Sequence, residues 1–173
     1  MTLVFLDTET TGLDPAKCSV WEIAYAVDEG PILSSFVRHS LEGASPFALT
    51  LNGYLTRNAG GSGTAAHDLT GVEFEADLMK AMKGATLVAA NPAFDASFLR
   101  ARWGEAPWKY RLFDVEAYAA GVLDWDEPKG LSAIADALRD LGKDIPTPDH
   151  TAAADVATLR ASFYALRAIR KAA

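Results

Sequence analysis

The segment "FLDTETTGL", residues 5–13, constrains the fold most strongly, because a fully apolar run leads directly into two acidic residues. Val4, Phe5 and Leu6 are typical of a strand that is buried in a sheet. Alternate residues of a strand share a face, so Asp7 and Glu9 present two carboxylates on one side, with Cα atoms about 7 Å apart. The end of an apolar strand is also where open sheets tend to place ligands. The sequence therefore predicts a central strand that ends in a polar site.

The order of the predicted elements indicates an α/β protein. Three β-rich runs come first, at residues 2–9, 20–27 and 32–38, and the short turns between them predict an antiparallel meander. A short apolar strand is predicted at residues 86–90, and residues 110–115 are a further strand candidate. Helical patterns cover residues 73–83, 92–103, 131–142 and about 150–171. This order predicts a mixed sheet flanked by helices.

Several residues mark the expected helix ends. Asn91 before Pro92 is a helix-start signal, and Ser132 is a second candidate N-cap. Gly84 and Gly142 are expected to stop their helices. Residues 45–71 carry a looser pattern in which no element is predicted.

Composition places the chain among single-domain proteins. Its 173 residues are expected to form one domain, 1–173, and no apolar run approaches the roughly 18 residues that a membrane span needs. The N-terminus lacks the pattern of a signal peptide, and the one cysteine, Cys18, fits a reducing cytoplasm. We therefore expect a cytoplasmic protein that is not associated with a membrane.

The net charge of −7 argues against broad electrostatic capture of nucleic acid. It does not exclude an enzyme that acts on nucleic acid, because acidic residues gathered around metal ions add to the negative count without repelling the substrate.

Acidic residues two positions apart carry little information by themselves. The chain contains five such pairs, and roughly three would arise by chance at this acidic content. The pair Asp7 and Glu9 differs from the other four by its context at the end of a buried strand.

Three further residues complete a candidate constellation. Asp95 lies near the start of a helix that follows a buried strand, where an acid also complements the helix dipole. Asp155 lies among small apolar residues of the last helix, where a salt bridge would equally explain it. His150 lies at or just before the start of that helix.

If the four acids converge, their like charges raise one another's pKa values unless cations neutralise them. Ligands that offer only oxygen suit Mg²⁺ or Mn²⁺, and two such ions about 4 Å apart form the clamp used for in-line attack on a phosphodiester. His150, with an ordinary histidine pKa near 6.5, is then a candidate general base for the attacking water.

The segments "FLDTETTGL", "NPAFDASFL" and "HTAAADVATL" resemble, in order and spacing, the three motifs of the DEDD (DnaQ-like) 3′–5′ exonucleases. The histidine five positions before the last acid is that of the DEDDh branch, since Thr151 stands where the sister branch has tyrosine. The resemblance implies a ribonuclease H-like fold with a five-stranded mixed sheet, three antiparallel strands followed by parallel ones. It implies Asp7, Glu9, Asp95 and Asp155 as ligands of two Mg²⁺ or Mn²⁺ ions and His150 as the general base.

The resemblance also implies contacts to the 3′-terminal nucleotide. The residues in or after the first motif that are expected to line this site are Thr8, Thr10, Thr11, Gly12 and Leu13. Phe98 is a further candidate that equally suits the core. His67, in "AHDLTG", matches a family histidine near the terminal nucleotide, although Asp68 replaces the glycine of the family pattern.

The sequence thus predicts a metal-dependent 3′–5′ exonuclease that releases nucleoside 5′-monophosphates from single-stranded DNA or RNA ends. Two alternatives stay open at this point: a proofreading subunit that works beside a polymerase, and a catalytically idle nucleic-acid-binding module. A homodimer is also compatible with the sequence.

Overall fold

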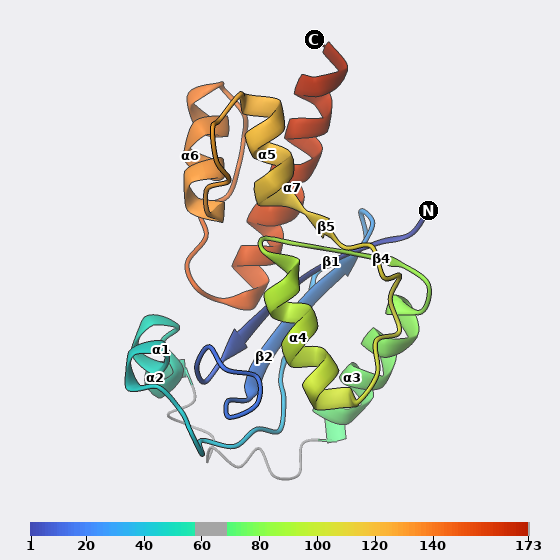
Figure 1. The fold of residues 1–173 in the computed structure, drawn as a ribbon, viewed down its shortest axis with the longest axis vertical. Coiled ribbons are helices and arrows are strands. Elements are labelled where there is room, and N and C mark those ends of the chain that lie inside the picture. Colours follow the sequence, from blue (N-terminus) through green and yellow to red (C-terminus); the bar gives the residue numbers. More distant parts are fainter. Residues whose placement is uncertain (58–68, 173) are drawn as a thin grey trace.

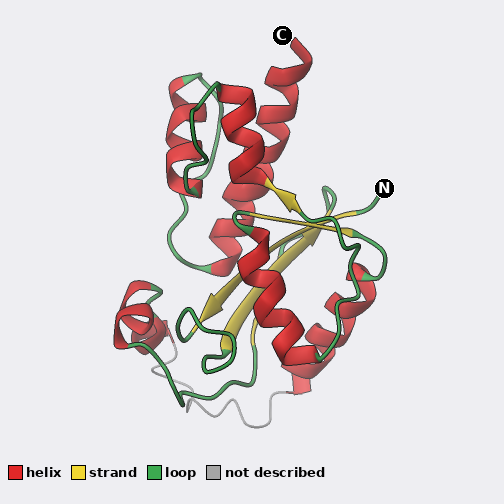
Figure 2. Ribbon diagram, viewed as in Figure 1, coloured by secondary structure: helices red, strands yellow, loops and turns green. Residues whose placement is uncertain are grey.

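A computed structural model describes residues 1–57 and 69–172 of the protein (Figure 1). Its centre is a five-stranded sheet with the strand order β3-β2-β1-β4-β5 (Figure 2). The strands are β1 (Leu3–Thr10), β2 (Val20–Val27), β3 (Leu33–Phe36), β4 (Thr86–Ala89) and β5 (Phe113–Asp114). β2 pairs antiparallel with both β1 and β3, whereas β4 pairs parallel with both β1 and β5. The predicted meander and mixed sheet are confirmed.

Helices cover both faces of this sheet. They are α1 (Pro46–Leu51), α2 (Tyr54–Arg57), α3 (Leu69–Met82), α4 (Pro92–Trp103), α5 (Val115–Leu123), α6 (Leu131–Asp140) and α7 (Ala152–Ala172). In Figure 1, α5, α6 and α7 form one group, α3 and α4 a second, and α1 and α2 lie near the end of β1.

β1 is buried on both faces, because its successive side chains point to opposite sides of the sheet. Phe5 packs in the core that α5, α6 and α7 share, whereas Val4 packs in the core formed with α3 and α4. The same alternation places Asp7 and Glu9 on the α7 side and Thr8 on the α4 side. Two separate cores thus hold one strand rigidly between them.

β4 pairs with only the first part of β1. Its register with β1 runs from Leu3 opposite Thr86 to Phe5 opposite Val88. The chain then leaves the sheet at Ala89 and enters α4 at Pro92. The start of α4 therefore lies beside the part of β1 that carries the acidic residues.

The structure corrects several expected boundaries. The strand expected at residues 110–115 shrinks to Phe113–Asp114, and the Asp114 carboxylate caps a helix, α5, that the pattern did not reveal. Helices α1 and α2 occupy part of the segment in which no element was expected. The side chain of Asn91 makes no capping hydrogen bond, because its backbone is left-handed with a φ of 54°. Ser132 is not an N-cap, since α6 begins at Leu131 after Gly130.

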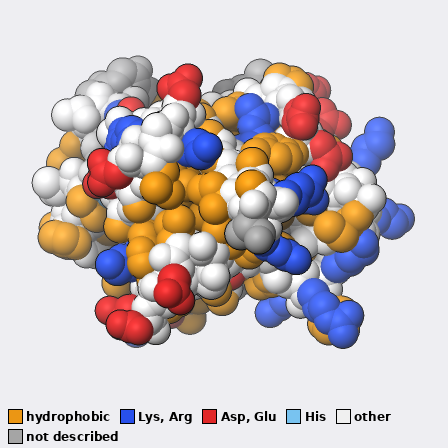
Figure 3. Space-filling view, turned by 90° about the horizontal axis from the view of Figure 1, so that it is seen from above, with side chains coloured by type: hydrophobic (Ala, Val, Ile, Leu, Met, Phe, Trp, Pro, Cys, Tyr) orange, Lys and Arg blue, Asp and Glu red, His pale blue; other side chains and the backbone are white. Residues whose placement is uncertain are grey.

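The surface bears both signs of charge. In the face shown in Figure 3, hydrophobic side chains occupy the middle and Lys and Arg are most numerous along one side. Among the helices of the described ranges, none combines the length and the apolar composition that crossing a membrane requires.

The aromatic cluster around Phe163 gives a test of this core. The Phe163 ring is 2% exposed, and its centroid lies 5.2 Å from those of both Phe5 and Phe113. We expect Phe163→Ala to lower the free energy of unfolding by about 3–5 kcal/mol, through lost burial and the cavity left behind. Urea denaturation measures this value.

The exposed Val72 of α3 supplies the control, and Val72→Ala should change the free energy of unfolding by less than about 0.5 kcal/mol. Similar losses in the two variants would contradict the assignment of Phe163 to the core.

Candidate metal site

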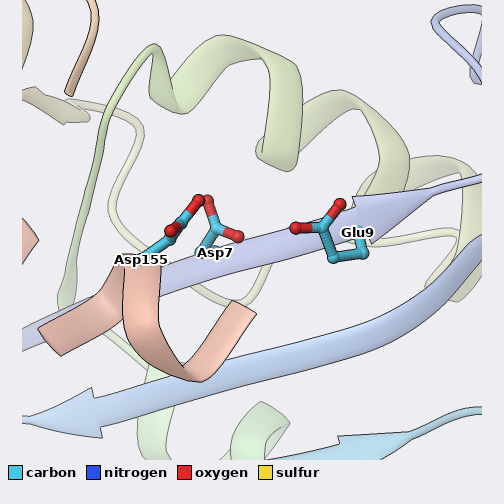
Figure 4. A group of neighbouring side chains, drawn as sticks. All are labelled: Asp7, Glu9 and Asp155. Atoms are coloured by element: carbon cyan, nitrogen blue, oxygen red, sulfur yellow. The ribbon is translucent and has the colours of Figure 1, made fainter. Parts of the chain in front are cut away.

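Three carboxylates meet at the end of β1. Single oxygens of Asp7, Glu9 and Asp155 all lie within 4.8 Å of one another. Asp7 and Glu9 come from one face of β1, and Asp155 comes from the first turn of α7, which crosses that face (Figure 4). Figure 4 shows the carboxylates of Asp7 and Asp155 turned toward each other, with Glu9 further along the strand. Residues almost 150 positions apart in the sequence are thereby brought together.

Asp95 reaches the same region from the other side of β1. It is 3% exposed in the first turn of α4, and its Oδ1 accepts a 2.7 Å hydrogen bond from the Thr8 hydroxyl. The charge of Asp95 is the largest electrostatic contribution that raises the pKa of Asp7, after burial itself. Asp95 therefore lies beside Asp7, and Thr8 fixes the orientation of its carboxylate.

Burial and mutual repulsion raise the pKa values of these acids. Burial, followed by the charges of Asp95 and Asp155, raises the pKa of Asp7 well above its usual range. Burial and the charge of Asp155 raise the pKa of Glu9 to about 8. Burial raises the pKa of Asp95 to about 7 against the opposing hydrogen bond from Thr8. The pKa of Asp155 is also raised, mainly by burial.

This arrangement fits a divalent cation. Carboxylates that resist ionisation when close together gain most from a positive charge placed among them. The donors are all oxygens, which suits Mg²⁺ or Mn²⁺. Three of the four acids named from the sequence thus meet within 4.8 Å, and Asp95 is bonded to Thr8, the residue after Asp7; together they would hold such ions.

His150 lies at the edge of this cluster. It is exposed and lies two residues before Ala152, the first residue of α7, and its backbone is left-handed with a φ of 61°. Both its charge and its backbone amide lower the pKa of Asp155, so this segment adjoins that carboxylate. Nearby, the Asp149 amide donates a 3.2 Å hydrogen bond to Oδ1 of Asp155.

One acidic neighbour was missed in the sequence. Glu22 of β2 is the register partner of Glu9 and is 4% exposed. Its charge contributes to the raised pKa values of both Asp7 and Glu9. The available signal was an acid within the otherwise apolar strand "VWEIAYAV", at a position that shares a face with small alanines.

The segment after the first motif is tied in place largely by its own hydrogen bonds. The Thr10 hydroxyl donates to the Gly12 carbonyl at 2.7 Å, and the Thr11 hydroxyl accepts from the Ser19 amide at 2.9 Å. A Cβ on Gly12 would lie 2.6 Å from the sulfur of Cys18, so a glycine is required for close packing. Leu13, by contrast, is 83% exposed. Leu13 is therefore the residue of this segment with most surface free for a ligand.

The remaining substrate candidates differ in their positions. Phe98 is 2% exposed and packs in the core with Phe94, so the structure favours its packing interpretation. His67 lies outside the described residues.

A pocket elsewhere in the fold is separate from this site. It has a volume of about 420 Å³ between α5 and α7, and Tyr118, Val122 and Ile169 contribute to its lining. Ile169 lies fourteen residues after Asp155 in α7, about 21 Å along the helix axis. This pocket is therefore remote from the carboxylates.

Solved structures share this fold. Exonuclease I of E. coli, in a zinc-bound complex with single-stranded DNA, superposes with a TM-score of 0.70 at 21% identity over 99% of this chain and 41% of its own. The same enzyme with an oligonucleotide gives a TM-score of 0.72 at 19% identity over 99% of this chain and 42% of its own. NrnC of Brucella melitensis superposes with a TM-score of 0.59 at 18% identity, over 98% of this chain and 74% of its own.

The chain thus spans about two fifths of the length of exonuclease I. No protein-family model and no curated protein sequence matches it. At these identities the likeness concerns the fold alone: the chain has the α/β fold of these solved nucleases, a five-stranded mixed sheet flanked by helices.

Proposed function

We propose that this protein is a metal-dependent 3′–5′ exonuclease that acts on single-stranded DNA or RNA ends. The observation that carries the proposal is the meeting of Asp7, Glu9 and Asp155 within 4.8 Å at the end of β1. A fold shared with exonuclease I supports it, because that enzyme was solved with single-stranded DNA. The net charge of −7 is compatible with this function, since the site itself concentrates acidic residues.

Asp7, Glu9, Asp95 and Asp155 would hold two Mg²⁺ or Mn²⁺ ions. When bound, such ions would neutralise the carboxylates, activate water and offset the charge that develops on the phosphate. Thr8 keeps Asp95 oriented, since its hydroxyl is bonded to that carboxylate.

His150 would accept the proton of the attacking water. As the water oxygen bonds to phosphorus, the bond from phosphorus to the 3′ oxygen of the preceding nucleotide breaks. The expelled 3′ oxygen takes a proton from solvent, and the products are a nucleoside 5′-monophosphate and a strand shortened by one nucleotide that ends in a 3′-OH. The exposed position of His150 allows it to pass the proton on to solvent.

Leu13 would pack against the terminal base, and the backbone of the segment from Thr10 to Gly12 would face the terminal sugar. The exposure of Leu13 supports the first contact. The internal hydrogen bonds of this segment support the second, because they hold its backbone in one conformation before a substrate arrives.

Removing one proposed ligand tests the function. Asp7→Asn keeps the shape of the side chain but removes its charge. We expect the rate of nucleotide release to fall more than about 100-fold, since loss of a residue that only supports a metal ligand already lowers metal affinity or activity about 10–100-fold. The assay uses end-labelled single-stranded DNA, single-stranded RNA and duplex with Mg²⁺ or Mn²⁺, and it also establishes the preferred substrate.

Asp77→Asn, on the exposed side of α3, is the matched control and should retain the wild-type rate. Undiminished hydrolysis by Asp7→Asn would refute the proposed function.

The proposed base has its own test. His150→Ala should lower the rate about 10²–10⁴-fold at neutral pH, because the proton of the attacking water loses its acceptor. The affinity for Mn²⁺, measured from the shift that Mn²⁺ causes in the melting temperature, should stay close to that of the wild type. An unchanged rate would remove His150 from the reaction.

The raised pKa values predict how stability depends on pH without metal. A carboxyl with a raised pKa binds its proton more tightly in the folded protein, so it stabilises the fold while protonated. This stabilisation is lost as the pH rises through the folded-state value, which for Glu9 is about 8. In the presence of a chelator, the melting temperature should therefore fall between about pH 6 and 8.

Mn²⁺ should reverse this trend, because it competes with protons for the same oxygens and binds better at pH 8 than at pH 6. Asp7→Asn should weaken both effects, whereas Asp77→Asn should leave them intact. A melting temperature in chelator that does not fall over this range would disprove the assignment of repelling carboxylates.

A further inference from the structure

Glu22 places a further carboxylate against the proposed metal ligands. It faces α7 from β2, directly across from Glu9 in the antiparallel register. It is 4% exposed, so water offers its charge little stabilisation. Its charge adds to the repulsion among the carboxylates of the site, so a cation beside it would stabilise this part of the fold.

Arg57, the last residue of α2, is that cation. Its guanidinium forms a salt bridge with Oε1 of Glu22. It lies over the ring of Trp21, with its central carbon 4.9 Å from the ring centroid. It also donates to the carbonyl of Asn52 at 3.3 Å. The guanidinium is therefore held in one orientation by an ion pair, an aromatic face and a carbonyl.

The same guanidinium contacts the segment that carries His150. Its Nη1 donates to the His150 carbonyl at 3.3 Å. The other oxygen of Glu22, Oε2, accepts from the amide of Ala152 at 3.3 Å. Arg57 and Glu22 thus bind the backbone on both sides of Thr151, at the point where α7 begins.

This segment needs such support. His150 has a φ of 61°, a left-handed conformation that residues other than glycine adopt at a cost and keep only when surrounding contacts require it. This backbone conformation sets the direction of the His150 Cα–Cβ bond and thereby the place from which its imidazole starts. A change in the backbone at residue 150 would also displace Asp155, since the Asp155 amide donates a 3.0 Å hydrogen bond to the carbonyl of Thr151.

We propose that Arg57 is a positioning residue for the exonuclease reaction: with Glu22 it fixes the left-handed turn at His150 and so directs the imidazole at the carboxylate site. This inference rests on the proposed function. Lysine cannot replace arginine here, because the position uses several donors of one planar group at once.

A matched ion pair elsewhere in the fold supplies the control. Arg102 of α4 bonds the carboxylate of Glu75 through Nε and Nη2 and the Arg38 carbonyl through Nη1. The side chains of Arg102 and Glu75 are 21% and 16% exposed, and those of Arg57 and Glu22 are 21% and 5% exposed. Arg102→Ala therefore removes a comparable arginine whose partners lie outside the His150 segment.

The test is a double-mutant cycle that measures single-turnover rates. Arg57→Ala should lower the rate about 10–100-fold in the wild-type background, as loss of outer support in metal sites does. In the His150→Ala background the same change should cost less than about 2-fold, because a residue that acts through His150 has nothing left to position. Arg102→Ala should lower the rate less than about 2-fold in either background.

Two further measurements separate positioning from general support of the fold. Methylguanidine added to Arg57→Ala should restore part of the rate and should not restore it in the double variant. Arg57→Lys, which keeps the charge and serves if Arg57→Ala does not fold, should show the same dependence on His150.

Equal losses in the two backgrounds, or no loss at all, would overturn the role of Arg57 while leaving the exonuclease in place. A wild-type protein without nuclease activity would instead refute the proposed function, and with it the reaction that Arg57 serves.

Discussion

Repulsion among carboxylates at the end of β1 is the constraint on which the rest of the site depends. Asp7, Glu9 and Asp155 are close enough to share a cation, and Asp95 and Glu22 add their charges from two sides. A sheet can hold such a group only if its backbone cannot move to relieve the repulsion. β1 meets this condition because helices pack against it on both faces.

The sheet is interrupted where the acids need space. β4 pairs with β1 only as far as Phe5, so the chain can turn into α4 and bring Asp95 beside the end of β1. Because side chains alternate along the strand, neighbouring residues of β1 point to opposite faces and make different contacts. Asp7 points toward α7, whereas Thr8 points toward α4 and holds the Asp95 carboxylate.

Charge balance extends beyond the four proposed ligands. Glu22 is more deeply buried than Glu9 or Asp155, yet its carboxylate is engaged by Arg57 and by the start of α7. The ion pair therefore offsets part of the negative charge that Glu22 brings to the cluster, and it joins β2, α2 and α7 around it. The fold uses one arginine to offset a charge and to support a strained turn.

Much of this arrangement could be predicted from the sequence. The apolar run of β1 and the alternation of Asp7 and Glu9 gave the strand and the face they share, because both follow from local periodicity. The resemblance to the DnaQ-like exonucleases named Asp95, His150 and Asp155 as their companions. The helix α5 escaped prediction because its start depends on a capping aspartate, Asp114, that the pattern had assigned to a strand.

The sequence by itself determined which residues carry charge. It also determined that Asp7 and Glu9 share one face of β1 and Thr8 lies on the other, because side-chain alternation is a property of the strand alone. Only the tertiary structure decided that Thr8 binds Asp95, that Phe98 is in the core, and that Glu22 and Arg57 meet beside His150. Those relations join residues distant in the chain, and they arise from how far β4 extends along β1 and where α2 and α7 lie against the sheet. No local pattern encodes such distances.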